Sequence, residues 1–118
     1  MLLFIFSILK WQAPRRSKLA SACALALVPD PQARPVLIAS PDAMNQRLET
    51  IVVCPLTSQL HPLWASRVAC DCDGLPSEVA VDQIRTIRKS RLGKPLGRLD
   101  AATAAEVRSV IRLLYAES

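Results

Sequence analysis

Residues 34–54, RPVLIASPDAMNQRLETIVVC, decide the fold that we predict for this chain. Within them, Val36–Ala39 and Thr50–Cys54 are short runs of β-branched and other apolar residues, and Ser40–Asn45 supplies residues typical of a turn. Runs of this length and composition are typical of buried strands. We therefore predict two buried strands joined by a turn, with Pro55 ending the second strand.

Three further strands are predicted downstream, over Ala65–Cys70, Glu78–Val81 and Gln83–Arg88. The dipeptide Asp73-Gly74 between the first two is a standard turn signal, and the third run alternates apolar with polar residues. No helix-length connection separates these strands, so a small SH3-like or OB-like β-barrel is favoured over a parallel sheet. The expected fold class is mainly β.

The hydrophobic period changes at the C-terminus, where we predict a helix over Ala101–Tyr115 with Asp100 as its N-cap. Its apolar residues recur at helical spacing on one face: Ala104, Val107, Val110, Ile111 and Leu114. A small β-barrel closed by one C-terminal α-helix is therefore the predicted architecture of residues 34–118.

Residues 1–33 differ from this pattern and are predicted to be a divergent, poorly organised N-terminal segment. The apolar run at residues 2–9 is far shorter than the roughly 20 residues of a membrane-spanning helix. The basic cluster follows this run, whereas a signal peptide carries its positive charge before the apolar stretch. We therefore expect no membrane association and a cytoplasmic location.

The amino-acid composition restricts which partners the chain is expected to bind and which side chains could carry out catalysis. With 118 residues, 51% of them hydrophobic, the chain is long enough for one modest core. The net charge of +5 favours polyanionic partners. His61 is the only histidine and the four cysteines lack zinc-binding spacing, so no two-histidine acid–base pair and no zinc site are expected. We expect no metal and no cofactor, which leaves catalysis to Arg, Asp, Glu, Ser, Thr or Cys.

Four blocks in register carry a resemblance to a known family: Arg34–Ile38, Pro55–Gln59, Asp82–Ile87, and Gly97–Leu99 before the terminal helix. In order, spacing and strand context they resemble the MazF/PemK toxins of type II toxin–antitoxin systems. The resemblance implies an SH3-like barrel that forms a homodimer and acts as a metal-independent, sequence-specific endoribonuclease on single-stranded RNA. It also implies a cognate antitoxin that blocks the RNA groove, and operator DNA bound through the toxin–antitoxin complex.

The resemblance also implies roles for particular residues. The family's main catalytic pair is the arginine of the Arg-Pro block and the threonine of the Pro-x-Thr block, here Arg34 and Thr57. In some members the aspartate of Asp-Gln-Ile-Arg lies near the RNA, and here it is Asp82. The other candidates for RNA binding come from the same blocks and from a basic cluster: Ser58, Gln59, Gln83, Arg85 and Arg88.

The chemistry is physically reasonable without histidine or metal. If the 2′-hydroxyl of the RNA attacks the adjacent phosphorus, the enzyme must stabilise a dianionic phosphorane. A guanidinium suits this task because it offers fixed, charged donors that match phosphate oxygens. Since arginine is effectively always protonated, we assign Arg34 to charge stabilisation rather than to proton transfer. Trp64 is the one plausible platform for base stacking, with core or dimer packing as its alternative role.

The sequence departs from the family before Arg34. Members normally begin with a Gly-Asp/Glu-Ile-Trp strand and a loop containing a glutamate, and residues 1–33 contain neither. Residues 2–9 or 19–28 are the candidates to replace that strand, and Ala80 stands where some members have a basic residue. An alternative function is therefore a catalytically impaired barrel that binds an antitoxin or nucleic acid. Inhibition of a topoisomerase is a third hypothesis, which the Pro55–Ser58 block makes less favoured.

Overall fold

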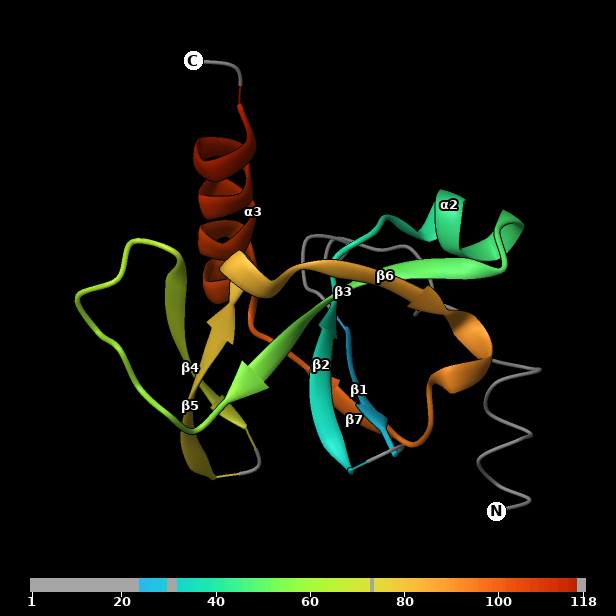
Figure 1. Cartoon of the computed structure of the whole chain (residues 1–118), viewed down its shortest axis with the longest axis horizontal. Helices are drawn as coiled ribbons and strands as arrows, with labels where there is room; N and C mark the ends of the chain where they lie inside the picture. Colours follow the sequence, from blue (N-terminus) through green and yellow to red (C-terminus); the bar gives the residue numbers. More distant parts are fainter. Residues whose placement is uncertain (1–23, 30–31, 73, 117–118) are drawn as a thin grey trace.

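The computed structural model describes residues 24–29, 32–72 and 74–116. The strands in this part of the chain form a strongly curled antiparallel sheet, a half-barrel with a helix at its C-terminal end (Figure 1). The predicted fold class is confirmed. The elements in chain order are β1 (Ala24–Val28), β2 (Arg34–Ile38), α2 (Asp42–Arg47), β3 (Thr50–Thr57), β4 (Arg67–Cys72), β5 (Leu75–Ala80), η1 (Val81–Gln83), β6 (Arg85–Arg88), η2 (Lys89–Arg91), β7 (Pro95–Arg98) and α3 (Ala101–Tyr115).

Strand β3 is the centre of the sheet because it pairs with β2, β5 and β6. Thr50–Val53 pair with β6 and Val53–Pro55 pair with β2, whereas Leu56 and Thr57 pair with β5. The change of partner follows Pro55, which has no N–H to donate to a ladder. β3 leaves β2 here, so the beginning of β2 and the end of β3 diverge (Figure 1).

The strands β1, β2 and β3 are buried on both faces of the sheet. Successive residues of β1, β2 and β3 belong in turn to two different cores, as the two-residue period of a strand requires. Burial on both faces explains why the first strands read as continuous apolar runs. The helix-side core, under α3, contains Leu25, Leu37, Cys54, Leu56, Val68, Val79, Val81, Leu99 and Val107. The barrel core, inside the curl, contains Ala26, Val28, Val36, Ile38, Ile51, Val53, Ile87 and Leu92.

Strand β1 lies within the segment 1–33 that we predicted to be poorly organised. Its residues pair with β2 on one side and with β7 on the other. Of the two candidates for a replacement first strand, 19–28 therefore includes a strand of the sheet, whereas 2–9 lies outside the described residues. The edge of β2 that would have been left open is covered by β1.

Several elements differ from the sequence-based expectation. The predicted turn at Ser40–Asn45 contains the start of the short helix α2, whose buried Asn45 donates its side-chain N–H to the Ser40 carbonyl over 2.9 Å. The Ser40 hydroxyl accepts the Val52 N–H over 3.0 Å, which attaches this turn to β3. The predicted strand Gln83–Arg88 is shorter, because Gln83 belongs to η1. We did not predict β7, whose residues are all exposed.

Helix α3 spans the predicted Ala101–Tyr115, and the predicted N-cap is confirmed, since the Asp100 carboxylate accepts the Thr103 N–H over 3.3 Å. This hydrogen bond lowers the pKa of Asp100. The helix packs on the helix-side core through Val107, Val110 and Ile111, and at its last residue the Tyr115 hydroxyl donates to the Val81 carbonyl over 3.1 Å. In the described part of the chain no helix combines the length and the apolarity that crossing a bilayer requires.

Leu37 and Leu75 form a matched pair for testing the core, since they are 0% and 65% exposed. Leu37→Ala should lower the free energy of unfolding by about 3 kcal/mol, because it leaves a cavity in the helix-side core. Leu75→Ala should change it by no more than about 0.5 kcal/mol. Urea denaturation followed by circular dichroism measures both, and equal losses for the two variants would contradict the assigned core.

Candidate functional site

Thr57 ends β3 and is half-buried at the start of the β3–β4 loop (residues 58–66). Its hydroxyl oxygen accepts the Gln59 N–H over 3.0 Å, the short-range bond typical of a threonine that begins a turn. A hydroxyl that accepts in this way still has its own proton to donate. The Thr57 hydroxyl can therefore donate a hydrogen bond to an incoming acceptor such as a phosphate oxygen.

Arg34 begins β2 and is exposed, with its guanidinium Nη2 donating to the Gln32 side-chain oxygen over 3.0 Å. It pairs with Val28 of β1 and precedes the β2 residues that pair with β3, just as Thr57 follows the β3 residues that pair with β2. The two predicted catalytic residues thus lie on either side of the point where β3 leaves β2.

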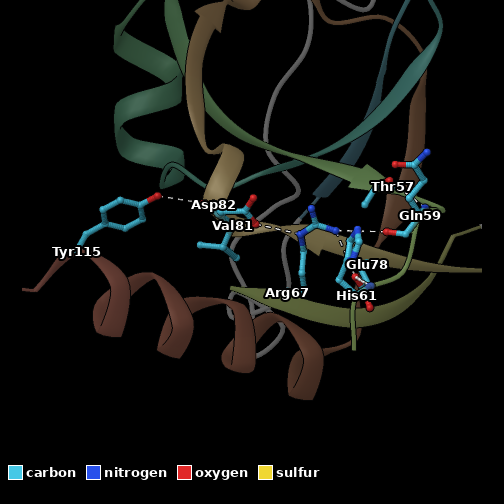
Figure 2. A network of polar contacts seen from close by, with 8 residues as sticks. All are labelled: Thr57, Gln59, His61, Arg67, Glu78, Val81, Asp82 and Tyr115. Carbon is cyan, nitrogen blue, oxygen red and sulfur yellow. Dashed lines mark hydrogen bonds and ion pairs between the residues drawn. The ribbon is translucent and has the colours of Figure 1, made fainter. Parts of the chain in front are cut away.

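Beside Thr57, a buried ion pair joins Arg67 and Glu78, which the sequence-based site did not include. Glu78 is the cross-strand partner of Thr57 on β5, and Arg67 begins β4. The Arg67 Nη1 lies 3.3 Å from Glu78 Oε1, and the two side chains are only 6% and 4% exposed. The same Glu78 oxygen accepts the His61 N–H over 2.9 Å. Figure 2 shows Arg67 between Asp82 and the Glu78–His61 pair.

Asp82, in η1, is the second carboxylate that pairs with Arg67, and its Oδ1 lies 3.0 Å from Arg67 Nε. Desolvation raises the pKa of Asp82, but hydrogen bonds from Arg67, Ser66 and its own backbone, together with the charge of Arg67, lower it by more, so it lies below its usual range. A carboxylate with a lowered pKa is a weak base, which suits positioning or hydrogen bonding rather than proton abstraction.

The β3–β4 loop also contains an aromatic stack. The His61 and Trp64 rings are parallel within 7°, with centroids 3.8 Å apart, and the Arg67 guanidinium carbon lies 4.7 Å from the Trp64 ring centre. Trp64 is 49% exposed, so it is not a core residue of this chain. It holds the loop against Arg67 through a cation–π contact.

The structure gathers some of the predicted RNA-binding residues and separates others. Ser58 and Gln59 directly follow Thr57, and Asp82 is bound to Arg67. Gln83 and Arg85 are exposed at η1 and at the start of β6. Arg88 pairs with Thr50 at the opposite end of β3, roughly 20 Å along the strand from Thr57.

Arg67 and Glu78 had a signal in the sequence that we did not use. Each is a charged residue at or within a predicted strand, and opposite charges on neighbouring strands are a common cross-strand pair. Recognising them requires the β4–β5 register, which places Ala69 opposite Glu78 and so makes Arg67 its diagonal neighbour.

The cysteines and carboxylates offer little other chemistry in this region. Burial, together with Cys72, Asp71 and Glu78, raises the pKa of the Cys70 thiol to about 11, so it stays protonated at neutral pH. Among the described residues, no three His, Cys, Asp or Glu side chains group as ligands for a metal ion. The features that remain are a threonine hydroxyl, an exposed arginine and a charged network that holds the loop between β3 and β4.

The chain is similar to a known protein family and to several solved structures. Residues 28–115 match the family model of the PemK-like, MazF-like toxin of type II toxin-antitoxin system. No curated protein sequence matches the chain significantly. The solved structure of the Mycobacterium tuberculosis toxin MazF-mt6 is similar, with a TM-score of 0.72 and 26% identity over 80% of this chain and 98% of that one.

Two similar structures contain toxins together with antitoxins. A structure of MazE-MazF from Deinococcus radiodurans gives a TM-score of 0.67 and 28% identity over 81% of this chain and 94% of that one. An endoribonuclease in complex with its cognate antitoxin, from a mycobacterial species, gives 0.68 and 26% over 86% and 99% of the two chains.

The two carboxylates on Arg67 should contribute unequally to stability. Glu78→Ala leaves a buried guanidinium without its buried partner and should lower the free energy of unfolding by about 3 kcal/mol. Asp82→Ala should cost about 1 kcal/mol, because the Asp82 side chain is 33% exposed. The exposed Glu106 on α3 supplies the control, with an effect within about 0.5 kcal/mol. A smaller loss for Glu78→Ala than for Asp82→Ala in urea denaturation would refute this assignment.

The lowered pKa of Asp82 also predicts a pH dependence. Because the carboxylate binds its proton more weakly in the folded state, its stabilising contribution is complete above the unfolded pKa of about 3.9. That contribution is lost as the pH falls through the lower folded pKa. The stability difference between the unmodified protein and Asp82→Asn should therefore be constant from pH 5 to 7 and shrink below about pH 4. Denaturation curves across this range measure it, and a difference that grows on acidification contradicts the sign.

Proposed function

The chain belongs to the PemK/MazF-like family of toxins of type II toxin–antitoxin systems, and from this premise we propose that it is a sequence-specific endoribonuclease that cleaves single-stranded RNA. The observation that carries the proposal is that the family match spans both the Arg34–Ile38 and the Pro55–Gln59 blocks. One of the similar structures is itself described as an endoribonuclease.

The proposed reaction is a transesterification within the RNA. The 2′-oxygen attacks the adjacent phosphorus, the bond from phosphorus to the 5′-oxygen breaks, and a 2′,3′-cyclic phosphate and a 5′-hydroxyl result. The 2′-hydroxyl loses one proton and the 5′-oxygen gains one, so the step is balanced. Charge accumulates on the phosphate oxygens in the transition state, and this is the charge that the protein must stabilise.

We assign Arg34 and Thr57 to that task. Arg34 is exposed and permanently charged, so it can contact a phosphate that approaches from solvent. Thr57 uses its oxygen to accept the Gln59 N–H, which leaves its proton for a phosphate oxygen. The residues that we assign to binding the flanking RNA are Ser58 and Gln59, which directly follow Thr57, together with Asp82, Gln83 and Arg85. We assign Arg88 to a more distant part of the RNA.

We further propose a cognate antitoxin as partner, since two of the similar structures contain MazE or an antitoxin. The toxin function implies a homodimer, operator DNA bound through the antitoxin complex, and action in the cytoplasm. The alternative of an impaired binding barrel is less favoured. One of its grounds is a missing first strand, and β1 pairs along β2 in the place of that strand.

Incubating the protein with a long single-stranded RNA in EDTA should give cuts at a short sequence motif. Arg34→Ala and Thr57→Ala should each lower the cleavage rate by at least about a hundredfold, because each removes a donor to the transition-state phosphate. Fragment ends mapped by primer extension and mass spectrometry should carry the cyclic phosphate and the 5′-hydroxyl.

Matched controls exist on the same chain. Thr50→Ala at the other end of β3 and Arg112→Ala on α3 remove an exposed threonine and an exposed arginine, and both should cleave at the unmodified rate. RNA methylated at the 2′-oxygen should stay intact. If the unmodified protein leaves RNA intact, or if Thr50→Ala is as slow as Thr57→Ala, the assignment fails.

A further inference from the structure

The most unusual side chain in the described structure is that of Arg67. Arginine is rarely buried, and a buried charge must be both paired and hydrogen-bonded. The Arg67 side chain is 6% exposed, and two carboxylates lie on it, Glu78 at 3.3 Å and Asp82 at 3.0 Å. Neither the resemblance nor the sequence pattern gave this residue a role.

The guanidinium connects three separate segments of the chain. Its Nε donates to Asp82 in η1, and its Nη1 donates both to Glu78 in β5 and, over 3.3 Å, to the Gln59 carbonyl in the β3–β4 loop. These acceptors lie in different directions, which the fixed fork of a guanidinium can satisfy together. A lysine ammonium is a single point charge and cannot keep all three in the same geometry.

Gln59 links this network to Thr57. Its carbonyl accepts from Arg67, and its N–H donates to the Thr57 hydroxyl oxygen (Figure 2). Both backbone polar groups of one residue are therefore held, one by the arginine and one by the threonine. The position of the Gln59 backbone decides where the Thr57 lone pair is used, and hence where its hydroxyl proton points.

We propose that Arg67 is a positioning residue, which holds the backbone of Gln59 through its carbonyl so that the Thr57 hydroxyl proton is directed at the scissile phosphate. This inference rests on the proposed ribonuclease function. Arg67 has a second effect in the same place. It neutralises Glu78, the cross-strand neighbour of Thr57, whose buried negative charge would otherwise repel a phosphate.

The test separates positioning from stability with two variants. Arg67→Met/Glu78→Gln removes one charge of each sign, which avoids a buried unpaired charge and leaves the net charge at the site unchanged. Arg67→Lys keeps the charge but loses the fork. Kinetics are measured on an oligoribonucleotide containing the cut site mapped for the unmodified protein, with melting temperatures measured in parallel.

Both variants should lower kcat at least tenfold, since a small displacement of a catalytic group has effects of this size. KM should stay within threefold, because the charge facing the RNA is preserved. Arg112→Lys on the exposed part of α3 is the matched control and should leave both constants unchanged. If either variant folds and retains kcat within threefold of the unmodified protein, the proposal is wrong.

A readout independent of catalysis distinguishes failure of this proposal from failure of the proposed function. The order parameter of the Gln59 N–H, from ¹⁵N relaxation, should fall from about 0.85 to below about 0.6 in Arg67→Lys, while that of Leu37 in β2 stays high. A loss of global stability alone would not produce this local change. If the unmodified protein does not cleave RNA, the ribonuclease assignment fails, and a Gln59 order parameter unchanged in Arg67→Lys overturns the positioning role itself.

Discussion

The structure depends on one strand, β3, being shared among three partners. Its residues Thr50–Val53 pair with β6, Val53–Pro55 pair with β2, and the last two residues pair with β5. This arrangement lets one strand belong to both halves of a strongly curled sheet (Figure 1). It also gives the sheet a core on each face, and it puts Thr57 at the junction between the two halves of the sheet. The site to which we assign the function includes this junction.

Much of the fold could be predicted from the sequence because its strongest signals are local. The runs at Val36–Ala39 and Thr50–Cys54 are too apolar for an exposed strand. The Asp100 cap and the helical spacing of apolar residues within Ala101–Tyr115 predict the helix over its whole length. β7 was missed because none of its residues is buried, so it has no hydrophobic pattern. Its place in the sheet comes from pairing with β1, a long-range contact that no local pattern contains.

The candidate site could be predicted from the sequence only in part. Arg34 and Thr57 came from a resemblance, and they lie where β2 begins and where β3 ends, beyond the part over which these two strands pair. Arg67 and Glu78 form the buried part of the region, yet each looks like an ordinary charged residue in the sequence. Their pairing depends on the β4–β5 register and on the path of the β3–β4 loop, which only the folded chain supplies.

The short ladder between β3 and β5 has a consequence for how the two parts of the sheet are held together. The β4–β5 hairpin is internally held by six residue pairs, from Arg67↔Ala80 to Cys72↔Leu75, but it joins the half-barrel through only Leu56↔Val79 and Thr57↔Glu78. The backbone ladder between the two parts is therefore short. The helix-side core, in which Leu37 of the half-barrel packs with Val68 and Val79 of the hairpin, keeps the two parts in register and so keeps Glu78 beside Thr57.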